Sequence, residues 1–122
     1  MGRKGVNRMN NERLFMSAIN AAACWWAYSA KNATEEQRDA FKDALRERLL
    51  EVVRKQNDPA FGIVLMNNTL GLDSLVRESA DVAGISCTDF PERVSMLVEY
   101  DVVSVSDGVV KPYRDIYVRG PI

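Results

Sequence analysis

The spacing of apolar residues changes along this chain, and that change limits the available folds more than any other feature. From Leu14 to Val53, apolar side chains recur every three or four residues, as in helices with one buried face. From Val102 onward the chain is instead dense in Val, Tyr and Ile around Asp107-Gly108, the dipeptide that most strongly indicates a β-hairpin. Helices followed by a β-rich end favour an α+β fold.

The first predicted helix spans residues 11–30, with Asn11 as its N-cap. Its apolar positions form a wide face that a core would cover: Leu14, Phe15, Ala18, Ile19, Ala22, Ala23, Trp25 and Trp26. Residues 1–10 precede it and combine two glycines with basic side chains. We therefore expect residues 1–10 to form a flexible basic arm and residues 11–122 to form a single globular domain.

A second helix begins after Thr34, because Thr34-Glu35-Glu36-Gln37 matches a capping box. It ends near Gln56, where Asn57-Asp58-Pro59 indicates a turn. The short link between the helices predicts an antiparallel helical hairpin over residues 11–56, in which the Trp25-Trp26 end packs on the first turns of the second helix.

Residues 59–118 are expected to form a smaller α/β part. The apolar run Phe61–Met66 fits a buried strand or a buried helical turn, and we favour the helical form. Asp73 is the predicted N-cap of a third helix over 73–83, and Gly84 is its predicted left-handed C-terminal residue. Strands are expected at 102–106 and 109–118, the second confined to an edge or a bulge by Pro112.

The segment Asp89–Asp101 supports two interpretations. Asp89-Phe90-Pro91-Glu92 can start a helix, and with Gly84 before it and a hairpin after it the outline over residues 59–118 resembles a winged helix. Alternatively, the alternation of apolar and polar residues over 93–99 predicts a strand, which would make a three-stranded antiparallel meander with the two strands that follow. The two interpretations remain open at this point.

Composition argues against several protein classes. The chain has 122 residues, 47% hydrophobic and 27% charged, which is typical of a folded domain. No apolar run is long enough to span a membrane, and the basic start is not followed by a signal-peptide core, so we expect a cytoplasmic protein.

No catalytic, cofactor-binding or metal-binding motif is present. The sequence contains no histidine and only two cysteines, Cys24 and Cys87, far apart in the chain. The commonest general base and the commonest metal ligand are thus missing. We expect a protein that is not an enzyme and needs no cofactor, with two reduced thiols and with Cys24 as a small core residue.

The C-terminal part of the chain is acidic. After Asn68-Thr69, nine acidic residues stand against five basic ones, a net formal charge of −4. Acidic surfaces suit docking on basic protein partners. We therefore expect a small protein-binding regulator or inhibitor, of a kind common in phages and mobile elements, which binds its partner through Asp89, Glu92, Glu99 and Asp101.

The alternative function is a DNA-binding regulator of the winged-helix type. It would use basic residues of the arm, the first helix and the wing on the DNA backbone: Arg3, Lys4, Arg8, Arg13, Lys111 and Arg114, with Arg119 nearby. A homodimer through the two N-terminal helices would double these contacts. The segment 89–101 has one arginine against four acidic residues, and the phosphates would repel those acids.

Overall fold

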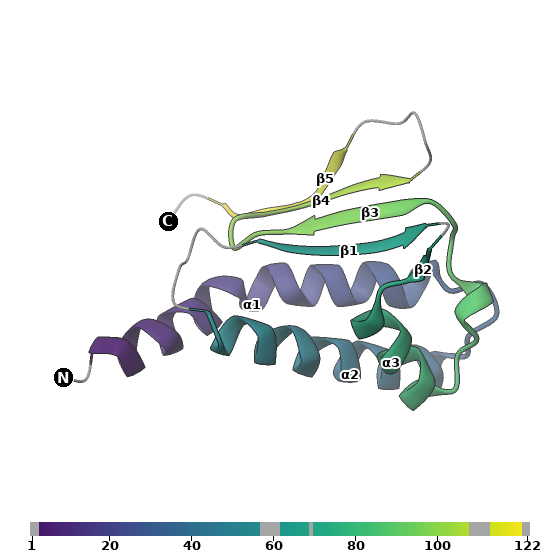
Figure 1. Ribbon diagram of the computed structural model, residues 1–122, viewed down its shortest axis with the longest axis horizontal. Helices are drawn as coiled ribbons and strands as arrows, with labels where there is room; N and C mark the ends of the chain where they lie inside the picture. The colour runs from purple at the N-terminus through teal and green to yellow at the C-terminus, as the bar shows by residue number, and fades with distance from the viewer. Residues whose placement is uncertain (1–2, 57–61, 69, 108–112, 121–122) are drawn as a thin grey trace.

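Three helices lie on one side of a five-stranded antiparallel sheet (Figure 1). The computed structural model describes residues 3–56, 62–68, 70–107 and 113–120, with side chains from Glu12 onward except that of Asp107. The α+β class is confirmed. The elements in chain order are α1 (Arg3–Ser29), α2 (Glu35–Arg54), β1 (Ile63–Asn68), β2 (Gly71–Leu72), α3 (Ser74–Ala83), the 3-10 turn η1 (Cys87–Asp89), β3 (Val94–Val98), β4 (Val102–Asp107) and β5 (Arg114–Val118).

Helix α1 begins well before the expected start at Asn11. The backbone is helical from Arg3 onward, so most of the segment predicted as a flexible arm continues the helix. No proline interrupts residues 3–10, and the single Gly5 weakens a helix by about 1 kcal/mol rather than ending it. Figure 1 shows these first turns extending past the end of the sheet.

The capping box of α2 forms as the sequence predicts. The Thr34 side chain accepts a hydrogen bond from the Gln37 backbone N–H, and the Gln37 side chain accepts one from the Thr34 N–H. Arg38 then reaches back and donates to the carbonyls of Ala27 and Ala30, at 3.3 and 2.9 Å. Because α1 has no basic residue in its last turn, Arg38 places a positive charge at the negative end of that helix.

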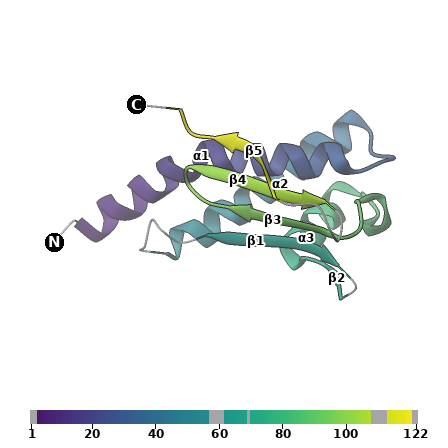
Figure 2. The same cartoon turned by 90° about the horizontal axis from the view of Figure 1, so that it is seen from above.

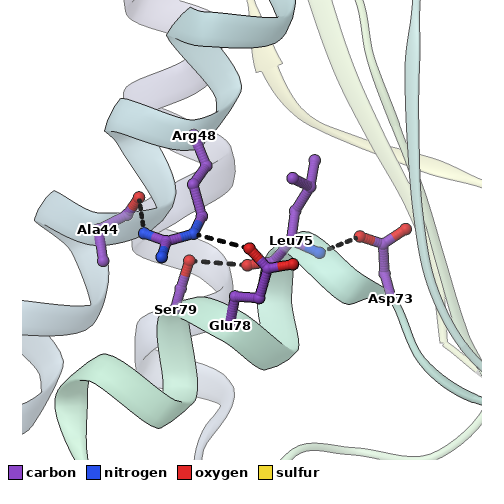
Figure 3. Close-up of polar contacts among 6 residues, drawn as sticks. All are labelled: Ala44, Arg48, Asp73, Leu75, Glu78 and Ser79. Carbon is purple, nitrogen blue, oxygen red and sulfur yellow. Dashed lines mark hydrogen bonds and ion pairs between the residues drawn. The ribbon is translucent and has the colours of Figure 1, made fainter.

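Helix α3 packs against α2, and both of its predicted ends are confirmed. The Asp73 side chain accepts from the Leu75 N–H at 2.9 Å, and Gly84 ends the helix with φ of 74°. Figure 3 shows Arg48 of α2 turned toward α3, where it pairs with Glu78 while also donating to the Ala44 carbonyl. The pair at 3.4 Å is partly solvent-exposed and adds little stability.

The described part of the segment Phe61–Met66, from Gly62 onward, is not helical, contrary to our expectation. Residues Ile63–Asn68 form strand β1, in which Ile63 and Leu65 are buried while Val64 and Met66 are exposed. Because β1 has apolar residues on both of its faces, the sequence does not show the alternation of buried and exposed positions that is typical of a strand. Tertiary pairing with β3 then decides the structure of the segment.

The strand interpretation of residues 93–99 is confirmed, and the winged-helix outline, which needs a helix starting at Asp89, is wrong. Val94–Val98 is strand β3, and the 3-10 turn η1 ends at Asp89. Pro91 and the valines after it favour extended backbone, and Arg93 adopts φ of 57°, which turns the chain into the strand. The predicted meander is present as β3, β4 and β5.

Strand order in the sheet is β2-β1-β3-β4-β5, antiparallel throughout. Rows of paired residues cross the central strands, and one such row is Leu65, Met96 and Val105. Strand β5 is an edge strand, as predicted, with a bulge opposite Val103 and Ser104. The turn that follows Asp107, from Gly108 onward, and Pro112 lie outside the described residues.

One core lies between the helices and the inner face of the sheet. Trp26 is fully buried, and its ring centroid lies 6.0 Å from that of Phe90, which in turn lies 5.4 Å from Phe41. Trp25 is only partly buried. Cys24 is exposed, contrary to our expectation. It points to the outer side of α1, although Ala23 before it and Trp26 after it are buried.

Candidate functional site

The outer face of the sheet is not covered by any described element. Figure 2 views the molecule from above, and the strands lie over the helices. Because side chains alternate between the two faces of a strand, the residues next to each buried position point outward. We call the outward side chains of β1, β3 and β4 the open face: Val64, Met66, Asn68, Ser95, Leu97, Val102, Ser104 and Ser106.

The outward positions of β1, β3 and β4 carry no charged side chain, whereas Asp115 of the edge strand β5 lies beside Ser104. This is unusual in a chain of which 27% is charged, since the solvated face of an antiparallel sheet is ordinarily polar. Val64 is 50% exposed and Met66 is 40% exposed. Leu97 is paired with Val64 across the strands and extends toward Gly62, where an added Cβ would lie 3.2 Å from the Leu97 side chain.

Three of the eight side chains of the open face carry hydroxyl groups. Ser95 lies on β3, and Ser104 and Ser106 lie on β4; Tyr113 and Asp115 are the partners of Ser95 and Ser104. The Tyr113 hydroxyl is hydrogen-bonded to the Ser95 hydroxyl, and Ser104 donates to Asp115 at 2.8 Å. Tyr113, itself 53% exposed, therefore bridges from the β5 side to β3.

The four acidic residues predicted to bind a partner do not form one patch. Asp89 and Glu92 precede β3, whereas Glu99 and Asp101 follow it. Since a residue advances about 3.3 Å along a strand, the two pairs are separated by roughly 20 Å. They flank the open face at its two ends.

Asp89 also has a structural role. Its backbone carbonyl accepts from the Lys31 N–H at 2.9 Å, and its carboxylate accepts from the Asn32 amide at 3.3 Å. These contacts hold η1 against the link between α1 and α2. Asp89 is therefore less suited to partner binding than Glu92, which is exposed.

Two of the basic residues proposed for DNA binding have side chains that the structure describes, and these two lie in different layers of the fold. Arg13 is exposed on α1 in the helical layer, and Arg114 begins β5 in the sheet layer. The side chains of Arg3, Lys4 and Arg8 and all of Lys111 lie outside the described residues.

A hollow of about 510 Å³ lies near the start of β3. Glu92 and Arg93 line it together with Cys87 and Thr88, and the Asn67 amide donates to the Pro91 carbonyl at 2.8 Å. A positive φ is uncommon for arginine. The left-handed conformation of Arg93 thus sets how this side chain leaves the end of the sheet.

A second hollow, of about 340 Å³, lies between α1 and α2, and Cys24 lines it. Slight burial lowers the pKa of the Lys42 ammonium, but the hydrogen bond to Asp39 and the nearby Cys24 and Tyr28 raise it, so that the pKa lies above its ordinary value. Lys42 therefore stays charged at neutral pH.

The described side chains include no group of three or more His, Cys, Asp and Glu that could hold a metal ion. Among the described helices, none combines the length and the apolar character needed to cross a bilayer. Neither a scan against models of known protein families nor a search of curated proteins gives a match.

Sequence reasoning missed the open face. The apolar residues of β1 were assigned to the core as one run, so the outward position of Val64 and Met66 could not be anticipated. The sequence does contain one indication of this face: the outward positions of three strands carry no charge. That pattern can be recognised only once the register of the strands is known.

Proposed function

We propose that this protein is a non-enzymatic protein-binding module whose docking surface is the open face. The proposal rests on one observation, the lack of any charged side chain on the outward positions of β1, β3 and β4. Centres of protein interfaces are depleted of charged residues and enriched in Tyr and Met, and both residue types occur on or beside this face. Glu92, Glu99 and Asp101 would then belong to the polar rim, where charge affects the association rate more than the affinity.

The docking surface thus differs from the acidic patch expected from the sequence. A partner would cover Val64, Met66 and Leu97 and would form hydrogen bonds with the serine hydroxyls. Basic groups on the partner would face the two acidic ends of the sheet. Docking through a segment 89–101 folded as a recognition helix is not proposed, because that segment is η1 and β3.

Site-specific photo-crosslinking tests this proposal. A photo-reactive amino acid at position 97 should yield a crosslinked protein in cells that express the chain, whereas the same group at Ala40, exposed on the outer side of α2, should not. Binding is then measured by calorimetry with the purified, identified protein. We expect Val64→Glu to abolish binding and Ala40→Glu to leave it unchanged. Equal crosslinking from both positions, or binding that Val64→Glu does not affect, would contradict the proposal.

A further inference from the structure

The hollow near the start of β3 combines apolar and charged side chains. Its lining comes from the ends of β1 and β2 and from the segment Cys87–Arg93. Among the lining residues, Phe90 is buried and Leu72 is partly buried, whereas Glu92 and Arg93 are exposed. Its volume of about 510 Å³ lies within the range of small-molecule sites, about 300–1,000 Å³, which pair an apolar lining with a few polar groups.

Two neighbouring charges line this hollow because the backbone departs from strand geometry. In an extended strand, consecutive side chains point in opposite directions. Arg93 has a φ of 57° instead, and both Glu92 and Arg93 line the hollow. A carboxylate and a guanidinium are thus presented to the same space.

These two charges are not used within the described fold. Neither side chain forms an ion pair or a hydrogen bond with a residue that the structure describes, and the two do not pair with each other. In the hollow between α1 and α2, by contrast, Lys42 is paired with Asp39 and Arg46 is paired with Asp43. The hollow near the start of β3 therefore keeps a positive and a negative group for a ligand.

The presence of both signs of charge decides the class of ligand. A simple anion would be attracted by Arg93 but repelled by Glu92, and a metal cation would meet the reverse. A molecule with an ammonium and a carboxylate on one carbon satisfies both groups at once. An apolar substituent on that carbon can contact Phe90 and Leu72.

We propose that this hollow binds a free α-amino acid with an apolar side chain. The Arg93 guanidinium donates to the carboxylate of the amino acid, Glu92 accepts from its ammonium, and its side chain covers Phe90 and Leu72. Because both charged groups are solvent-exposed, we expect a dissociation constant of about 1 mM. The hollow adjoins the open face at Asn68, but this inference does not rest on the proposed function.

Titration with L-phenylalanine, followed by NMR of the isotope-labelled protein, tests the proposal. The backbone amide signals of residues 87–93 should shift and reach saturation. N-acetylphenylalanine lacks the ammonium and phenylalaninamide lacks the carboxylate. Each should bind roughly fivefold more weakly than L-phenylalanine, because one charge-assisted contact is lost at an exposed site.

Two variants assign each contact to its residue. Arg93→Asn removes the guanidinium but keeps a residue that tolerates a positive φ, so the fold should be retained. It should no longer distinguish L-phenylalanine from phenylalaninamide, and Glu92→Gln should no longer distinguish L-phenylalanine from N-acetylphenylalanine. Asp101→Asn removes the same charge at the other end of β3 and should bind all three probes as the wild type does.

The two thiols measure independently where the ligand binds. Cys87 lines this hollow, whereas Cys24 is exposed on α1. Bound L-phenylalanine should slow the alkylation of Cys87 by iodoacetamide severalfold and leave that of Cys24 unchanged, as measured by mass spectrometry.

Three outcomes would overturn the inference: no shift of the signals of residues 87–93 up to the solubility limit of L-phenylalanine, equal binding of the three probes to the wild type, or unchanged discrimination in both Arg93→Asn and Glu92→Gln. Crosslinking from position 97 does not involve this hollow. The proposed function and the amino-acid site can therefore each fail without the other.

Discussion

Trp26 and Trp25 are neighbours in the sequence but differ in burial. Trp26 is fully enclosed against Phe90, while Trp25 lies at the margin of the core. We expect Trp26→Ala to lower the free energy of unfolding by about 3–5 kcal/mol and Trp25→Ala to lower it by clearly less. Urea denaturation of the two variants measures the difference.

Trp26→Phe is a matched control for Trp26→Ala. The Trp26 indole nitrogen is buried without a hydrogen-bond partner among the described residues, so Trp26→Phe removes ring volume but no hydrogen bond. We expect this variant to lose less stability than Trp26→Ala. Losses below about 1 kcal/mol for both alanine variants would contradict a core role for this pair.

Gly84 is held at a φ that other residues adopt with strain. Its φ is 74°, and an added Cβ would meet no atom closer than 3.6 Å, so the cost of substitution comes from the backbone and not from crowding. We expect Gly84→Val to destabilise the protein by about 1–2 kcal/mol and Gly84→Asn to do so by less, since asparagine tolerates this conformation. An unchanged melting temperature for Gly84→Val would contradict the assignment.

At the scale of elements, Gln37 joins two helix ends. Its side-chain oxygen accepts from the Thr34 N–H and its side-chain nitrogen donates to the Gly84 carbonyl, both at 2.9 Å. The first turn of α2 is thereby attached to the last turn of α3.

We expect Gln37→Ala to lower the free energy of unfolding by about 1–2 kcal/mol, because both bonds are lost. Gln37→Glu keeps the acceptor and loses only the donor, so it should lie between Gln37→Ala and wild type in chemical denaturation. Equal stability of all three proteins would show that neither bond contributes.

The predictability of each element depends on how local its determinants are. The Thr34 cap, the Asp73 cap and the Gly84 terminus are decided by contacts within four residues or so, and the sequence predicts all three. Strand β1 is decided by pairing with β3, some thirty residues later, and its apolar run contains no local period. Cys24 was misplaced for a different reason: one position along a helix changes its direction by about 100°, so a residue between two buried ones can face solvent.

At the scale of the molecule, the fold bears on DNA binding. The residues that would read base edges form a turn and a strand, and the chain from Leu70 onward has a net charge of −4. We expect no binding to random duplex DNA at low salt in a fluorescence polarisation assay. Binding that weakens steeply as salt increases would contradict this, because it would indicate that the basic side chains contact phosphates.

The open face itself could not be located from the sequence, because it depends on which side of the sheet the helices cover. That choice follows from the register of four strand pairs and from the packing of α1 below β3, β4 and β5. By contrast, the sequence shows the acidic residues at the ends of this face as a charge imbalance. It does not show that β3 separates them into two pairs.

The order of the strands also has a consequence for how fast the protein folds. Three of the four strand pairs join neighbours in the chain, whereas β1 and β3 pair across β2, α3 and η1. This pairing is the one that must close a long loop before its contacts offset the lost chain entropy. Substitutions in β1 that weaken this pairing, such as Leu65→Ala, should therefore slow refolding in stopped-flow experiments, whereas equally destabilising changes in β5 should mainly speed unfolding.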